Sequence, residues 1–277
     1  MSLTDVVEHL ICPVCADGVE LTGRALRCRR GHAFDVARQG YVSLLVGSRA
    51  PGTADSAAMV AARETFLGAG HFAPLAEAVA AACPAGARVV ADAGAGTGYY
   101  LAEVLDRRPE AVGIALDVSK HAIRRAARAH SRLGAVVADV WRPLPVGDGK
   151  ADVLVNVFAP RNGPEFARVL ADGGTLIVVT PTRRHLHPLV EELGLLSVDE
   201  AKERRVAESL GGRFVEAERS LHEFTVSLGH EAVAAVVGMG PSAWHTDPGA
   251  MPTKIAKLPK TSEVAASFRM SIFHRRL

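Results

Sequence analysis

The chain has 277 residues and a formal net charge of +2, which leaves room for one large domain or for a small and a large domain, and which excludes a polycation. Hydrophobic residues make up 48% and charged residues 22%, as in an ordinary globular protein, and no apolar run reaches the length of a membrane span. The first fifteen residues lack a basic start, an apolar core and a small-residue cleavage site, so we expect no secretory signal and a cytoplasmic protein without membrane association.

The first pattern in the chain is a cluster of residues that commonly bind metals. Cys12 and Cys15 are separated by two residues, and after twelve further intervening residues Cys28 precedes His32 in a CxxxH motif. Zn²⁺ prefers tetrahedral thiolate and imidazole ligands, and a two-residue spacing lets one tight turn present two sulfurs. Four ligands leave no open position, so the pattern predicts a structural zinc site, with a short hairpin around Gly23 between the ligand pairs.

Two alternatives to zinc remain open at this stage. The residues are compatible with unliganded thiols, and with a redox CxxC pair, although redox pairs normally open a helix that follows a strand. Clustered cysteines of this kind favour a reducing compartment over a disulfide framework. Cys83 lies outside the cluster and is expected to be a small buried residue.

The same segment is rich in arginine. Between residues 24 and 38 it holds five arginines and one acidic residue, Asp35. Such a patch is suited to phosphate contacts, and it is equally typical of a solvated face in an arginine-rich protein. The candidate phosphate-contacting residues are Arg24, Arg27, Arg29, Arg30 and Arg38.

A linker and two helices are predicted next. The stretch from Val46 to Ser56 is rich in Gly, Ser and Pro and predicts a linker or mobile loop. An amphipathic helix follows and ends at Gly68 and Gly70, and a second begins at His71 and Phe72. We therefore divide the chain into a zinc-binding domain (residues 1–45), a linker with a connecting helix (46–70) and a larger domain (71–277).

From Arg88 onward, strands and helices alternate. This alternation predicts a doubly wound parallel sheet, with Ser119 as the N-cap of one helix. Near the C-terminus, residues 262–276 alternate in hydrophobicity and predict a late antiparallel strand close to the sheet edge. The buried strands of the series are predicted at residues 88–94, 111–117, 135–139, 151–159 and 173–181.

The loops that follow the first three strands carry the candidate ligand-binding residues, because ligands of such sheets bind outside the carboxyl ends of the strands. The loop Asp92–Tyr100 (DAGAGTGYY) contains glycines that let backbone approach a ligand closely. Tyr99 stands where a dinucleotide fingerprint requires glycine, and no Walker GK[ST] motif follows. Asp117 ends the second strand, where an acid can accept both hydroxyls of a ribose, and Asp139 ends the third, placed to meet an adenine edge.

A glycine-rich motif headed by the acid Asp92, with one acid at the end of each of the next two strands, resembles the class I methyltransferases that depend on S-adenosylmethionine. Each of the three acids is alternatively a helix cap or a turn residue. The resemblance implies an α/β fold, with a class I (Rossmann-like) methyltransferase domain behind a small N-terminal zinc-binding domain. S-adenosylmethionine and structural Zn²⁺ are the expected cofactors.

Longer motifs narrow the resemblance to the 23S rRNA guanine-N1-methyltransferase family. The junction CRRGHAFDVARQGYV, the helix ARETFLGAGHFAPL and the segment DVSKHAI are similar to those of the family, and the likeness covers nearly all of the chain. Its members methylate N1 of one guanine in a hairpin of 23S rRNA, and one branch is associated with resistance to tylosin-type macrolides. The resemblance implies 23S rRNA as the partner, RNA recognition by the zinc-bearing domain with its five arginines, and a homodimer.

The resemblance also assigns site residues. The cysteine and histidine cluster matches the zinc ligands of the family, and Phe72 stands where some relatives carry tyrosine, which removes one hydroxyl group. Phe72, Gly94, Gly96, Tyr99, Tyr100, Asp117 and His185 match the region around the methyl donor. With the loop residues, the predicted donor site consists of Phe72, Asp92, Gly94, Gly96, Gly98, Tyr99, Tyr100, Asp117, Asp139, Asn156 and His185.

Methylation of guanine N1 requires that the N1 proton leave, which calls for a base or for a donor that stabilises the O6 enolate. No residue stands out as the base, and the candidates are Asn156, Arg161 and His185. The stretch from Asn156 to Pro160 lacks the double proline of the exocyclic-amine methyltransferases, which argues against adenine-N6 chemistry. His185 is alternatively a loop histidine without a role. Phe158 and Trp244 are candidate stacking partners for a flipped base, with simple packing as the alternative for Trp244.

Two other functions remain open. The first is a small-molecule methyltransferase with a structural zinc knuckle. This hypothesis leaves the arginine cluster unexplained. The second is a non-catalytic RNA-binding protein that keeps a degenerate fold, and the intact DAGAGTG loop and Asp117 weigh against it.

Overall fold

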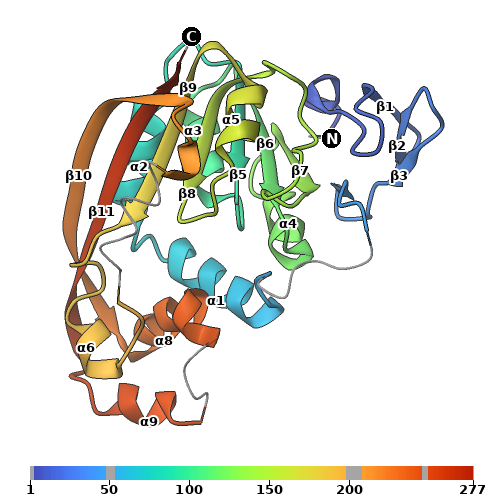
Figure 1. The fold of residues 1–277 in the computed structure, drawn as a ribbon. Coiled ribbons are helices and arrows are strands. Elements are labelled where there is room, and N and C mark those ends of the chain that lie inside the picture. The colour runs from blue at the N-terminus through green and yellow to red at the C-terminus, as the bar shows by residue number, and fades with distance from the viewer. Residues whose placement is uncertain (1–2, 48–53, 198–207, 245–248, 277) are drawn as a thin grey trace.

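A computed structural model describes residues 3–47, 54–197, 208–244 and 249–276 (Figure 1). Residues 48–53 of the predicted linker lie outside this described part. Within it, the strands form a three-stranded sheet of order β1-β2-β3 and an eight-stranded sheet of order β10-β11-β9-β8-β5-β6-β7-β4. No helix in the described ranges is long and apolar enough to cross a membrane.

The small sheet lies at the N-terminal end of the chain, on the side of the large sheet where β7 and the edge strand β4 lie (Figure 1). β1 and β2 pair in an antiparallel hairpin whose turn contains Gly23, as the sequence predicts. β2 also pairs with β3 in antiparallel orientation. The elements of this unit are the short helix η1 (Val7–His9) and the strands β1 (Val19–Thr22), β2 (Ala25–Cys28) and β3 (Ala33–Asp35).

The next strand, β4 (Tyr41–Ser43), belongs to the large sheet and pairs in parallel with β7 (Leu133–Val137) at its edge. Sequence periodicity does not reveal this strand, because three residues are too few to show an alternation. Backbone hydrogen bonds therefore join the N-terminal part to the larger domain, and the division at residue 45 stays a prediction.

The centre of the large sheet is parallel, as the alternating pattern predicts. Chain order runs outward from β5 in both directions, through β6 to β7 on one side and through β8 to β9 on the other, so the topological switch point lies between β5 and β8. The central elements are β5 (Val89–Ala93), α3 (Tyr99–Arg107), β6 (Val112–Asp117), α4 (Lys120–Ala126), β8 (Ala151–Val157), α5 (Gly163–Val169) and β9 (Leu170–Pro181).

Ser119 caps α4 as predicted, since its Oγ accepts the backbone N–H of Ala122 at 3.3 Å. β11 is antiparallel and lies one strand in from the edge, between β9 and the edge strand β10, which also matches the expectation. The remaining elements are α1 (Ala57–Gly68), α2 (Ala73–Ala82), α6 (Leu189–Leu193), β10 (Phe214–Gly229), α8 (His230–Met239), η2 (Pro241–Trp244), α9 (Met251–Ala256) and β11 (Thr261–Arg275).

Two buried clusters cover the two faces of the large sheet. One holds Phe72 and Leu101 beneath helices α2 and α3. The other extends from Leu116 in β6 to Leu10 and Leu26 in the N-terminal unit, so the small unit has no separate core. Helices α1 and α8, far apart in sequence, pack side by side below the sheet (Figure 1).

Candidate functional site

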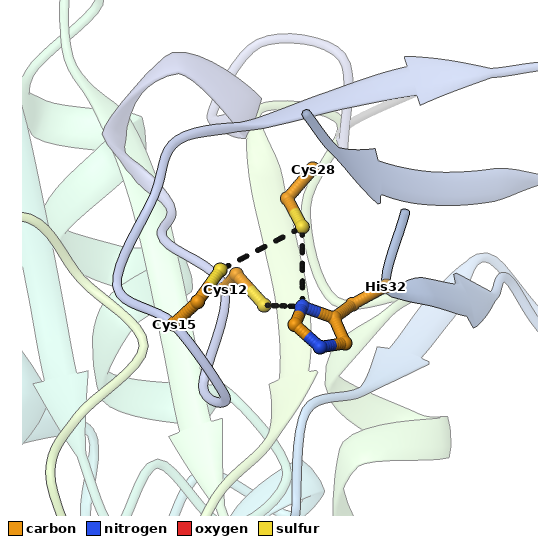
Figure 2. A group of neighbouring side chains, drawn as sticks. All are labelled: Cys12, Cys15, Cys28 and His32. Carbon is orange, nitrogen blue, oxygen red and sulfur yellow. Dashed lines mark hydrogen bonds between the residues drawn. The ribbon is translucent and has the colours of Figure 1, made fainter. Parts of the chain in front are cut away.

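The four predicted metal ligands meet at the base of the β1–β2 hairpin (Figure 2). Nδ1 of His32 lies 3.5 Å from Sγ of Cys12 and 3.3 Å from Sγ of Cys28, and the sulfurs of Cys15 and Cys28 are 3.7 Å apart. Thiolate and imidazole ligands at the corners of a tetrahedron around Zn²⁺ lie roughly 3.5–3.8 Å from one another. Both the donor set and its spacing therefore fit a closed structural zinc site.

Asp17 binds two of the predicted phosphate-contacting arginines inside this unit. Its two carboxylate oxygens accept Nε and Nη2 of Arg29 at 3.1 and 3.0 Å, and one of them also accepts Nε of Arg30 at 2.9 Å. The carboxylate joins the loop after Cys15 to the turn after Cys28. Sequence reasoning missed Asp17, because nothing in a linear pattern pairs it with residues twelve and thirteen positions away.

A second site opens at the switch point of the large sheet. A cavity of about 640 Å³ lies at the carboxyl ends of β5, β6 and β8, and helix α1 contributes to its wall. Its size suits a ligand as large as a nucleoside derivative. Of the predicted donor-site residues, the structure brings together Phe72, Asp92, Gly94, Gly96, Tyr99, Tyr100, Asp117 and Asp139 at this cavity.

The backbone conformation of the glycine loop requires that residue 94 have no side chain. This residue has φ +90°, and a Cβ added to it would lie 2.2 Å from Cβ of Ala159 in the loop after β8. Gly98 has a structural role and does not line the cavity. It is the N-cap of α3, and a Cβ there would meet Ala126 and Ala129 at 3.2 Å, so its small size lets α3 and the end of α4 pack closely.

Asp117 holds the glycine loop in place. One carboxylate oxygen accepts the N–H of Gly96 at 2.8 Å, and the other accepts the N–H of Ser119 at 2.8 Å. Burial raises the pKa of Asp117, whereas the two backbone donors favour its charged form. The turn-forming role that the sequence left open is thus real, and each oxygen keeps a lone pair for a ligand hydroxyl.

Asp92 lies at the bottom of the cavity, 1% exposed. Within the described residues its Oδ1 has no hydrogen-bond partner. Burial, with a smaller contribution from the charge of Asp117, raises the pKa of Asp92 to about 8. A buried carboxyl oxygen without a protein partner is costly unless a ligand binds it, so the cavity fits a donor molecule that carries polar hydrogen-bonding groups.

Comparison with known proteins agrees with both sites. A family model described as the N-terminal zinc ribbon of RlmA matches residues 10–47, and a methyltransferase-domain model matches residues 90–174. The 23S rRNA (guanine(748)-N(1))-methyltransferase of Streptomyces fradiae is 50% identical over 97% of both chains. A protein of Micromonospora griseorubida, named as a 23S rRNA (guanine-N(1)-)-methyltransferase, is 53% identical over 96% of this chain and 97% of its own.

The chain belongs to the 23S rRNA guanine-N1-methyltransferase family. Membership confirms the predicted enzyme class, with S-adenosylmethionine as the methyl donor and a zinc ribbon in front of the methyltransferase domain. Among solved structures, a Haloferax volcanii protein bound to the Trm112 methyltransferase activator matches with a TM-score of 0.51 and 19% identity, over 83% of this chain and all of its own. At that identity the likeness shows the methyltransferase fold alone.

The cavity of this family member does not include the catalytic candidates of the sequence. Asn156 is fully buried, and its amide nitrogen donates to the carbonyl oxygens of Ala93 and Pro160 at 2.8 and 2.9 Å. Arg161 donates to the carbonyl of Ala159 at 3.3 Å, and burial lowers its pKa. Both residues therefore organise the loop after β8, and neither lines the cavity.

His185 lies one layer behind the cavity wall. Its ring centroid is 4.6 Å from that of Phe268, 5.8 Å from that of Phe72 and 6.4 Å from that of Phe158. Phe72 and Phe158 line the cavity themselves, whereas His185 does not. The position of His185 in the sequence, after β9, indicates the correct end of the sheet but not the direction of its side chain.

Sequence reasoning missed several cavity residues, among them Asp55, Arg63, Trp141 and Met239. Arg63 of α1 binds the carboxylate of Asp55 and donates to the carbonyl of Met239 at 2.9 Å, and it is the one cation among the described lining residues. Its place in the ARETFL motif was the available signal. Trp141, 64% exposed, and Met239 also line the cavity. The side chain of Phe158, the first predicted stacking partner, is 43% exposed and lines the cavity. The side chain of Trp244, the second, lies outside the described part of the structure.

Proposed function

We propose that the protein transfers a methyl group from S-adenosylmethionine to N1 of a guanine in a hairpin of 23S rRNA. The observation that carries this proposal is the near-full-length identity of 50% with the Streptomyces fradiae enzyme that is named for guanine 748, an identity that spans the zinc ribbon as well as the donor cavity. We propose the same guanine as the target here, and resistance to tylosin-type macrolides as the consequence.

Different residues around the cavity are assigned to different parts of the methyl donor. We assign Asp117 to the ribose hydroxyls, Asp139 to the adenine edge, and the loop of Gly94 and Gly96 to close backbone contact. Asp92 and Arg63 both line the cavity, and we assign them to the amino and carboxylate groups of the methionine portion, respectively. S-adenosylmethionine supplies an already activated methyl group, so the protein mainly positions the two reactants and excludes water.

The guanine must leave its stack before N1 can meet the methyl group. Two aromatic side chains at the cavity are accessible, Phe158 (43% exposed) and Trp141 (64% exposed). We assign both to stacking against the flipped base. The backbone of Phe158 has φ +56°, a strained conformation for a residue with a side chain. The bonds from Asn156 to the carbonyls of Ala93 and Pro160 brace this loop, so we assign Asn156 a positioning role.

The test is primer extension on 23S rRNA from cells with and without the protein. Methylated N1 cannot pair with the incoming nucleotide, so reverse transcriptase should stop at guanine 748, the position named for the relative. The Asp117→Asn variant, with its weakened donor binding, should give a weaker stop than the wild-type protein. Identical stop patterns with and without the protein would reject the proposal and favour the small-molecule methyltransferase.

Two further predictions accompany the proposed activity. We propose a homodimer and a cytoplasmic location, the former from the family resemblance and the latter because ribosomal RNA is the substrate. Light scattering coupled to size-exclusion chromatography measures the oligomeric state directly. A mass of one chain at micromolar concentration would contradict the dimer without affecting the proposed chemistry.

A further inference from the structure

A second cavity, separate from the donor site, lies between the zinc-binding unit and the methyltransferase part. It has a volume of about 760 Å³, and it shares no lining residue with the donor cavity. One wall comes from the β1–β2 hairpin and from the turn before β4, and the opposite wall comes from the turn after α4. The cleft therefore exists only because the two parts of the chain are packed together.

The charge of this cleft is positive and unbalanced. Arg24 and Arg38 line it from the zinc-binding side, and Arg128 lines it from the turn after α4. All three are exposed, and within the described ranges their side chains make no hydrogen bond or ion pair. No acidic residue is among the residues that line the cleft.

Arg29 and Arg30 are in a different situation. Both are held by the carboxylate of Asp17 within the zinc-binding unit, and neither lines the cleft. Ion pairs of this kind leave a guanidinium less available to an outside anion, because part of its charge and some of its N–H donors are already used. Four of the five arginines that look equivalent in the sequence therefore fall into two groups in the structure, and the fifth, Arg27, neither lines the cleft nor bonds to Asp17.

Three unpaired guanidinium groups around one concavity are suited to a chain of phosphates. A guanidinium presents planar, paired N–H donors that match phosphate oxygens, and like charges held around one cleft repel until an anion neutralises them. Leu21 and Val36 add apolar side chains to the lining, and Gln39 and Ser131 add hydrogen-bonding groups. A phosphate backbone with its sugars has the matching combination of anionic, polar and apolar surface.

Helix α4 connects this cleft to the donor cavity. The N-cap of the helix is Ser119, whose Oγ donates to the carbonyl of Asp55 at the donor cavity, and the turn that follows the helix carries Arg128. Seven residues of α-helix span about 10 Å. One RNA hairpin can therefore contact the cleft with its backbone while a flipped base occupies the donor cavity.

We propose that this cleft is a binding site for the phosphate backbone of the substrate RNA, formed jointly by Arg24 and Arg38 of the zinc-binding unit and by Arg128 of the methyltransferase part. Arg29 and Arg30 instead stabilise the zinc-binding unit through Asp17. This assignment rests on the proposed function for the identity of the RNA, and it adds a contact from the methyltransferase part that the sequence pattern does not contain.

The test measures binding of a labelled 23S rRNA hairpin to the full chain by fluorescence anisotropy over a salt series. Arg24→Gln, Arg38→Gln and Arg128→Gln are each compared with Arg124→Gln, which removes an exposed arginine of α4 that does not line the cleft. Each cleft variant should bind about tenfold more weakly and lower the slope of log K against log salt by about 0.7–0.9, because one phosphate contact is lost. Arg128→Lys should restore most of the slope, and affinity for S-adenosylmethionine should be unchanged in all variants.

Cleft variants that bind the hairpin no more weakly than Arg124→Gln, with the same salt slope, would overturn the inference. If the wild-type protein methylates the hairpin and the cleft variants have the same KM for RNA as the wild type, the inference is also overturned. The proposed function would stand in that case. If the wild-type protein binds the hairpin through the three arginines but does not methylate it, the proposed function is rejected. The cleft would still be an RNA-binding site.

Discussion

The carboxylate of Asp117, at the end of β6, accepts the backbone N–H of Gly96 at 2.8 Å, in the loop after the neighbouring strand β5. The acid that the family pattern assigns to a ribose thus also shapes the glycine loop before any ligand binds. Its second oxygen anchors the start of α4 through Ser119. One side chain therefore couples the two loops that form the floor of the donor cavity.

Asp117→Asn should weaken binding of S-adenosylmethionine by on the order of 10- to 100-fold, since a hydrogen bond to a charged group is worth about 1.5–3 kcal/mol. The amide has one acceptor oxygen and places an NH₂ against a backbone N–H, so it cannot reproduce both bonds. Isothermal titration calorimetry measures the change. Glu110→Gln, in an exposed ion pair with Arg88, is the control and should bind normally. Equal affinities for the two variants would show that Asp117 does not serve the donor.

Gly94→Ala should abolish donor binding and lower the free energy of unfolding by about 1–3 kcal/mol, because the new Cβ meets Ala159 at 2.2 Å and the backbone is left-handed. Gly173→Ala isolates the backbone contribution, since Gly173 has φ +76° and open space around a Cβ. Urea unfolding of both variants separates the two effects. If Gly173→Ala destabilises the protein as much as Gly94→Ala, the close approach to Ala159 contributes nothing.

The residues that the sequence placed correctly are those whose chemistry is local. Zinc ligands follow from spacing alone, and the Asp92–Tyr100 loop follows from glycines next to a buried strand. Asn156 and His185 show the limit, because periodicity indicates which end of the sheet a residue occupies but not whether its side chain enters the cavity. Arg63 was missed because tertiary packing of α1 against α8 and α4, which a linear pattern does not show, brings α1 to the donor loop.

Stability should depend on pH through Asp92. Burial raises its pKa to about 8, whereas an unfolded chain has an aspartate pKa of about 3.9. The folded protein therefore holds the proton and the unfolded chain releases it between these values, so the free energy of unfolding should fall as pH rises from about 4 to about 8. Asp92→Asn should remove this part of the dependence, so its stability relative to wild type should increase with pH. Denaturant unfolding of both proteins at several pH values gives the comparison, and parallel curves would contradict it.

Loss of the metal should affect more than the first forty residues. Cys12→Ser should release zinc and expose the amides of β1 and β2 to hydrogen exchange, because the coordination shell lacks one of its four ligands. Leu10 and Leu26 share a buried cluster with Leu116, so the melting temperature of the whole protein should also fall. Cys83→Ala, at a buried cysteine outside the cluster, should keep its zinc. Retention of the metal by Cys12→Ser would contradict the assigned ligand set.

The exposed aromatic side chains at the donor cavity should serve the base rather than the methyl donor. Phe158→Ala and Trp141→Ala should each lower kcat/KM for the RNA by roughly 5- to 100-fold, because stacking of one base on an aromatic ring is worth about 1–3 kcal/mol. Donor affinity should change little, since Asp117 and the glycine loop are intact in both variants. Leu221→Ala, which removes a side chain 63% exposed on β10, is the matched control for loss of exposed apolar surface.

A fluorescent purine at the target position of the hairpin provides a second measurement of the same assignment. Its emission should rise when the base leaves the stack, and a ring that receives the base should then quench part of that emission. Wild-type protein and Leu221→Ala should give the same signal, whereas Phe158→Ala and Trp141→Ala should change it at saturating RNA. If these two variants instead lose donor affinity while the signal stays at the wild-type level, the aromatic residues hold the donor, and the base stacks elsewhere.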